Sequence, residues 1–415
     1  MDSYITRKTV KIDLITILAL IILARISCPA LSNIPFFSMA FVFIYGVAFM
    51  ALFFIRTNRI KTHDVYLILA AIIYTLYMFF RCYLANKGLF ARDAFNAYII
   101  VFLTMILIWA KQQPSATKKM LLKLVFACLI FDYVYSITVL FFDPGASRIA
   151  AATSVLEKSP YDILNAIGGF DAVYGGISVI TISLFMRRTF KEHSVKNKVT
   201  FILLVLCTVF IVMAAYATAL VLLILAIALF VGSKNKRLSF LLIAGIVAIL
   251  VFHEQVGQGI IDLSKKISYS ETISQKMNEF GYMVKTFETA GTYEGEEGRF
   301  ARMIWSIDTF KKYPIFGGIG IPGAKVGGHS EFLDLLGNFG LMGLVVISSY
   351  FICLYRNIKT SLRDGEMKKC FNIIMWVFII SSVLNPSLYS LQMVPIILML
   401  PLCSEYVDDK INKQL

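Results

Sequence analysis

Long apolar stretches separated by short polar connections make up most of the chain. An apolar run of about 18 or more residues is long enough to cross the hydrocarbon core of a bilayer as an α-helix. The pattern therefore predicts an all-α, polytopic membrane protein with about 12 transmembrane helices. The predicted spans cover residues 12–31, 36–55, 64–84, 94–110, 120–142, 165–186, 199–215, 218–232, 238–253, 331–355, 370–388 and 391–404.

One long polar segment, residues 254–330, interrupts this pattern between the ninth and tenth predicted spans. Apolar residues recur at helical spacing over 258–290 and again over 299–313, which predicts amphipathic helices. Pro314, a glycine-rich turn and His329 then lead into the tenth span. The sequence thus predicts three parts, which are residues 1–253 with nine helices, residues 254–330 as a large outer loop, and residues 331–415 with three helices and a short tail.

Composition and charge favour a membrane protein over a soluble one. Only 16% of the 415 residues are charged and 58% are hydrophobic, which leaves too few charges to cover a soluble globule. The net charge of +14 comes from 40 Lys and Arg against 26 Asp and Glu. If the chain starts in the cytoplasm, 24 of these basic residues fall in cytoplasmic segments and 13 in outer ones. Because cytoplasmic loops are enriched in Lys and Arg, both termini are expected in the cytoplasm, and no nucleic-acid partner is expected.

Four features follow one another in and after the long loop: Arg299, a helix, the sequence PIFGGIG at 314–320, and HSEFLDLLGNFGLMGL at 329–344. This order, over about 45 of the 415 residues, resembles the O-antigen polymerase and ligase superfamily. Its members are bacterial polytopic glycosyltransferases that act on undecaprenyl-diphosphate-linked glycans. The resemblance implies a GT-C-like fold in the bacterial cytoplasmic (inner) membrane. It also implies these glycans and the lipid bilayer as partners, with a chain-length regulator and a flippase of the same pathway.

His329 is the candidate catalytic base in this resemblance. Glycosyl transfer from a lipid diphosphate needs a base for the acceptor hydroxyl, and imidazole titrates near neutral pH. The resemblance implies that Arg299 contacts the leaving diphosphate, because a guanidinium makes paired charge-assisted bonds. Arg302 lies one helical turn later and is a second diphosphate-binding candidate. The alternative is that His329 caps the tenth helix and that both arginines face solvent or headgroups.

The sequence departs from the family at the turn between the seventh and eighth spans. Ligases in particular carry an Arg there, whereas residues 213–220 contain none. Arg81 and Arg25, near the outer ends of the third and first spans, are candidates to supply this charge, since arginine inside a membrane helix is costly and usually functional or paired. The alternative is that both reach out to headgroups. Asp171 is a candidate to orient an arginine, bind sugar hydroxyls or pair within the bundle, and Glu331 is a further substrate-binding candidate.

The sequence carries no pattern for a metal or a cofactor. It lacks HExxH and DxD motifs and any carboxylate cluster with metal-ligand spacing, so metal-independent chemistry without a cofactor is expected. The hypothesis that follows is a polymerase that joins undecaprenyl-diphosphate-linked repeat units into O-antigen or capsular polysaccharide. One alternative is a ligase that transfers the polymer to lipid A core, which the missing arginine disfavours. The other is a lipid-linked oligosaccharide flippase, which the lack of an evident internal repeat disfavours.

Overall fold

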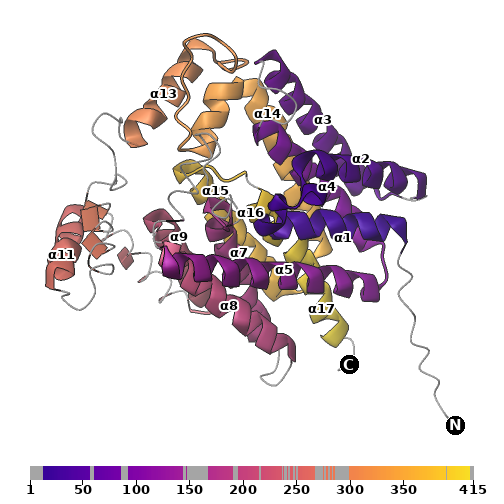
Figure 1. Ribbon diagram of the computed structural model, residues 1–415, viewed down its shortest axis with the longest axis horizontal. Helices are drawn as coiled ribbons and strands as arrows, with labels where there is room; N and C mark the ends of the chain where they lie inside the picture. The colour runs from indigo at the N-terminus through magenta and orange to yellow at the C-terminus, as the bar shows by residue number, and fades with distance from the viewer. Residues whose placement is uncertain are drawn as a thin grey trace.

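The described part of the chain is all-helical (Figure 1). The computed structural model describes residues 13–56, 60–85, 92–143, 146, 167–189, 195–214, 216–235, 251–266, 299–388 and 390–411, with separate positions between 237 and 248 and between 274 and 285. No strand occurs among these residues.

Most of the predicted spans coincide with helices. Within the described residues, an apolar helix lies at every predicted position except 238–253. There the structure describes a few positions up to 248 and then residues 251–253, the last of which begins α11. In the part of the chain that the structure describes, six helices are long and apolar enough to cross a membrane by length and composition, namely α2, α3, α5, α7, α14 and α15. The helices are α1 (Leu14–Ser27), α2 (Met39–Arg56), α3 (Thr62–Leu84), α4 (Arg92–Lys111), α5 (Ser115–Phe142), α7 (Phe170–Thr189), α8 (Val195–Ala214), α9 (Ala217–Gly232), α11 (His253–Lys266), α13 (Arg299–Lys312), α14 (Glu331–Ser361), α15 (Gly365–Leu384), α16 (Ser390–Val394) and, after a π-helical turn at Pro395–Met399, α17 (Leu400–Ile411).

The distribution of exposed apolar side chains indicates a membrane protein. α7 and most of α4 are buried among the other helices. The outer helices α2, α3, α5 and α14 expose large hydrophobic side chains along their length, among them Ile55, Leu76, Phe131 and Val345. Helices that are apolar on both their packed and their open faces need a hydrocarbon solvent.

The ends of the helices gather at two opposite ends of the bundle. At one end, the basic end, ion pairs join Arg56 to Asp13, Lys118 to Glu405 and Arg188 to Glu366 across helix termini. The opposite end, the loop end, carries α13 and residues 313–330, which lie beside the beginning of α14 at the top of Figure 1. Lys111, at the end of α4, interacts electrostatically with both Glu405 and Lys61. Because Lys61 follows Arg56 by five residues, the beginning of α1 and the side chain of Glu405 in α17 lie at the same end.

α11 covers part of the predicted amphipathic region and lies away from the bundle in Figure 1. Its Gly257 packs against Gly281 and Lys285, because a Cβ at Gly257 would come within 2.6 Å of the Gly281 oxygen. The His253 ring nitrogen Nδ1 lies 2.9 Å from the Lys285 carbonyl oxygen. α11 and the described positions between 274 and 285 thus form a close-packed helical unit.

Candidate active site

The first helix after the long loop, α14, is broken inside an apolar run. Gly340 has φ 63° and ψ −162°, a left-handed backbone conformation that glycine adopts without strain. In a continuous helix the N–H groups of Leu341 and Met342 would donate to the carbonyls of Gly337 and Asn338. The break frees these four backbone groups, and in a membrane each needs another partner.

The segment 314–319 of the loop supplies all four partners. It folds against the break so that its own N–H groups and carbonyls replace those of the missing helical turn. The bonds run from Gly318 N to Gly337 O (2.7 Å), Ile319 N to Asn338 O (3.1 Å), Leu341 N to Pro314 O (2.8 Å) and Met342 N to Ile315 O (3.0 Å). The loop is thereby fixed to α14 by its backbone.

The end of helix α3 contacts both this break and the loop segment packed into it. The Arg81 guanidinium donates to the Phe316 carbonyl at 2.5 Å, and the Gly317 and Asn338 carbonyls lie 3.5 Å from the same nitrogen. The Tyr77 hydroxyl donates to the Phe339 carbonyl at 3.0 Å. Arg81 therefore supports the loop through backbone carbonyls. Its assignment to the leaving diphosphate stays a prediction.

Replacing Arg81 by alanine is expected to lower the melting temperature in detergent by about 5 °C, because bonds from a charged donor contribute about 1.5–3 kcal/mol. The measurement is thermal aggregation followed by size-exclusion chromatography. Lys312→Ala, at an exposed position at the end of α13, is the control and should leave the melting temperature unchanged. An unchanged melting temperature for Arg81→Ala would contradict a supporting role.

Two side chains fix the stretch that carries His329. The buried Ser306 hydroxyl of α13 donates to Asp334 Oδ1 at 2.6 Å and accepts from Gly327 N at 3.0 Å. Asp334 Oδ2 accepts from Ser330 N at 3.0 Å, and the Ser330 side chain caps α14 by accepting from Leu333 N. Gly327 and Ser330, on either side of His329, are therefore both anchored by the same serine–aspartate pair.

His329 faces Arg302 across this anchored loop. Arg302 Nη1 lies 3.3 Å from His329 Nε2. A guanidinium can only donate hydrogen bonds, so this contact requires an unprotonated Nε2 and a neutral imidazole. Gly327 allows the loop to pack closely against Arg302, because a Cβ atom at this position would lie 2.1 Å from the Arg302 carbonyl oxygen. The pair combines a nitrogen that can accept a proton with a fixed positive charge.

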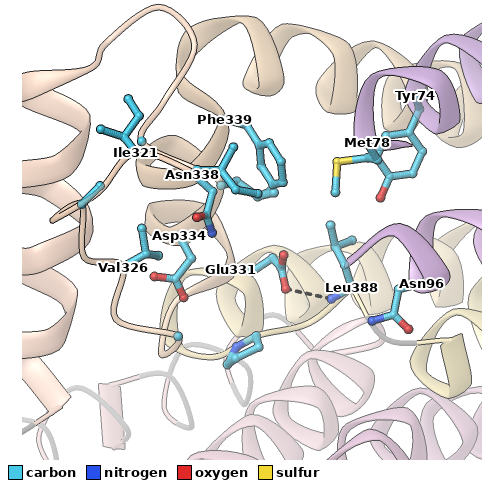
Figure 2. A pocket seen from close by; sticks show the side chains of 17 residues that line it. Tyr74, Met78, Asn96, Ile321, Val326, Glu331, Asp334, Asn338, Phe339 and Leu388 are labelled. Atoms are coloured by element: carbon cyan, nitrogen blue, oxygen red, sulfur yellow. Dashed lines mark hydrogen bonds between the residues drawn. The ribbon is translucent and has the colours of Figure 1, made fainter. Parts of the chain in front are cut away.

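A cavity of about 380 Å³, here called the polar chamber, is lined by Gly328 and Glu331, which lie on either side of His329 in the chain. Figure 2 shows Glu331, Asp334 and Asn338 of α14 opposite Tyr74 and Met78 of α3 and Asn96 of α4. No Lys, Arg or His is among its lining residues in the described part of the chain. Carboxylates and amides suit sugar hydroxyls, which donate and accept hydrogen bonds. Glu331 also joins the helix ends by accepting from the N–H groups of Ser387 (2.8 Å) and Leu388 (3.1 Å).

Of the predicted site, the structure brings His329 and Arg302 into contact, and Glu331 lines the polar chamber. Arg299 begins α13 one turn before Arg302, and its side chain lies outside the described residues. Arg25 donates to the Phe37 carbonyl at 3.0 Å near the end of α1. Asp171, in the first turn of α7, is near enough to Asp132 for an electrostatic interaction. Roles for Arg299, Arg25 and Asp171 in binding substrate stay predictions.

Several residues of the site were not predicted from the sequence. Glu331, Asp334 and Asn338 recur at intervals of three and four, which places them on one face of α14. That polar stripe in an apolar helix is a signal for Asp334 and Asn338. Asn96 and Ser306 carry no such signal, because only the tertiary structure brings α4 and α13 to α14.

No group of three or more His, Cys, Asp or Glu side chains suited to a metal ion occurs in the part of the chain that the structure describes. Comparison with known proteins finds no family model and no curated protein that matches this chain.

Proposed function

We propose that this protein is a metal-independent membrane glycosyltransferase that polymerises lipid-diphosphate-linked saccharide repeat units. The observation that carries the proposal is the contact between His329 and Arg302, at an anchored loop beside a polar chamber. The order of motifs in that loop, which resembles O-antigen polymerases and ligases, gives the substrate class. The product would be O-antigen or capsular polysaccharide.

His329 and Arg302 have different roles in the proposed reaction. When the acceptor binds, its hydroxyl replaces Arg302 as the hydrogen-bond donor to His329 Nε2. Nε2 then takes that proton as the hydroxyl oxygen bonds to the anomeric carbon of the donor. The bond between that carbon and the diphosphate oxygen breaks, and the electron pair leaves with the diphosphate. Arg302, with Arg299 one turn away, stabilises the developing negative charge. The chamber side chains of Glu331, Asp334 and Asn338 hold the sugar hydroxyls.

The proposal includes a topology of twelve spans in the bacterial cytoplasmic membrane. Nine spans would precede the loop at 254–330 and three would follow it. The basic end would face the cytoplasm and the loop end the outer side, because Lys and Arg concentrate in cytoplasmic segments. The helix ends joined by the pairs Arg56–Asp13 and Lys118–Glu405 support this orientation by lying at one end.

The proposal is tested with the purified full-length protein in detergent and a defined undecaprenyl-diphosphate-linked repeat unit, in the presence of EDTA. The expected products are a ladder of glycan lengths and released undecaprenyl diphosphate. Absence of new glycosidic bonds, or a ladder that EDTA abolishes, would contradict the proposal. Addition of lipid A core as acceptor distinguishes a ligase, which would transfer a preformed polymer to it.

Replacing Arg302 by alanine is expected to lower the rate of transfer about 10²-fold, because the leaving diphosphate loses one preorganised charged donor. Arg302→Lys should recover part of this loss, since it restores the charge but not the planar fork. Steady-state release of undecaprenyl diphosphate measures both. The control is Lys311→Ala on the same helix, whose exposed side chain pairs with Asp308 and which should keep the full rate. Equal rates for all three variants would remove Arg302 from the site.

A flippase is the second candidate, and Asp132 is the observation that favours it. Asp132 is buried in α5, and both of its carboxylate oxygens have no hydrogen-bond partner among the described residues. Buried carboxyl groups inside membrane helices are typical of proton and ion pathways. Movement of a lipid-linked oligosaccharide across liposomes without new glycosidic bonds, lost in Asp132→Asn, would establish this function instead.

A further inference from the structure

A second cavity of about 660 Å³ lies between α14 and α15. Apolar side chains dominate its walls, including Leu344, Ile347 and Phe351 of α14 and Met375, Trp376 and Ile379 of α15. It follows α15 from Asn372 to Val383, a length of about 17 Å at the rise of an α-helix. We refer to this cavity as the apolar groove.

The apolar groove and the polar chamber have a common wall. Glu331, Leu335 and Leu388 line both cavities. The common wall lies at the beginning of α14, two residues after His329. A polar cavity, a transfer site and an apolar channel are therefore adjacent at the loop end of the bundle.

The groove is accessible from the side that faces hydrocarbon. Trp376 is 61% exposed, Ile352 is 51% exposed and Ile379 is 49% exposed, and all three line the groove. A polyprenyl chain in the groove would bury these side chains, but because it comes from lipid rather than from water, this burial adds little free energy. A preference of the groove for a polyprenyl chain over bulk lipid must therefore come from the shape of the groove and from contacts to the attached headgroup.

We propose that the apolar groove holds the polyprenyl chain of the donor substrate while its first sugar lies in the polar chamber. This inference rests on the proposed function. A lipid-linked saccharide is an amphiphile whose polar and apolar parts are joined at a diphosphate. The two cavities likewise meet, at Glu331, Leu335 and Leu388, and Glu331 follows His329 by two residues. The groove positions the anomeric carbon by holding the chain, and it admits the donor sideways from the bilayer.

The test uses two neighbouring serines of α14 that line different grooves. Ser348 lines the apolar groove, whereas Ser349 lines a different groove against α3. The full-length protein in nanodiscs is incubated with a polyprenyl diphosphate that carries a photoactivatable group on its chain, and the labelled peptides are identified by mass spectrometry. We expect labelling within 372–383 and 344–355, reduced at least tenfold by Ser348→Trp and less than twofold by Ser349→Trp. Excess phosphatidylglycerol should not compete.

Activity provides the second readout. Ser348→Trp should raise KM for a donor with a full-length chain but not for a donor with two isoprene units. Equal labelling of the two serine variants, or competition by phosphatidylglycerol, would overturn the proposal, the latter by making the groove a site for bulk lipid. If the protein polymerises the repeat unit but is labelled outside the groove, the proposed polyprenyl site is wrong and the proposed function stands. If the groove is labelled but no new glycosidic bonds form, the groove is a polyprenyl site and the proposed function is wrong.

Discussion

Replacing His329 by alanine is expected to lower the rate of glycosyl transfer by about 10²–10⁴-fold, the usual contribution of a positioned general base. The imidazole is held by anchored neighbours, because Gly327 and Ser330 both bond to the Ser306–Asp334 pair. Its replacement therefore removes the proton acceptor without loosening the loop. The measurement is kcat for release of undecaprenyl diphosphate under saturating donor.

The matched control is His63→Ala. His63 lies at the basic end of α3 with half of its side chain exposed, 3.6 Å from Asp64, and it should keep wild-type activity and stability. His329→Ala should also keep its melting temperature and its binding of the labelled polyprenyl diphosphate. Retention of full activity by His329→Ala would exclude the base assignment and favour the alternative in which this histidine is structural.

Helix positions in this chain were largely predictable from local sequence. An apolar run specifies a membrane helix without reference to the rest of the molecule, since the solvent is the same along its whole length. The predicted span 331–355 illustrates both the success and its limit. A helix does begin at Glu331, but it is broken at Gly340 and continues to Ser361. The break depends on the segment 314–319, whose position no periodicity reveals.

The candidate site was predictable only where its residues lie close together in sequence. His329 and Arg302 belong to one loop, and the structure places them 3.3 Å apart. Arg81 shows the opposite case, because its carbonyl partner Phe316 lies 235 residues further along the chain. An arginine near the end of a membrane helix predicts a function or a partner. The surrounding sequence does not reveal that the partner of Arg81 is a peptide carbonyl.

The broken helix gives the site its rigidity. Four backbone hydrogen bonds fix residues 314–319 to α14, and Thr309 of α13 donates to the Lys325 carbonyl further along the same loop. The loop that carries His329 is thus held by backbone contacts in addition to the side chains of Arg81, Ser306 and Asp334. This arrangement keeps irregular backbone buried in protein, which is the condition for such backbone near a membrane interior.

Replacing Gly317 by alanine is expected to lower the melting temperature in detergent by more than about 10 °C, a loss of several kcal/mol. Gly317 has φ 72°, and a Cβ there would lie 2.2 Å from the carbonyl carbon and oxygen of Asn338. Those atoms belong to the break in α14, which cannot retreat without losing the bonds from Gly318 and Ile319. Two costs therefore add, the strain of a positive φ and the collision with fixed backbone.

Gly323→Ala separates these two costs. Gly323 has φ 80°, close to that of Gly317, but no heavy atom lies within 4 Å of the position of its Cβ. Its replacement adds only backbone strain of about 1–3 kcal/mol, so the melting temperature should fall by a few degrees. Because the Gly317 variant moves the loop at its junction with α14, it should also lose glycosyl transfer, whereas Gly323→Ala should retain most of it. Equal melting temperatures for the two variants would show that the loop does not pack into the break, and the site built on that packing would have to be abandoned.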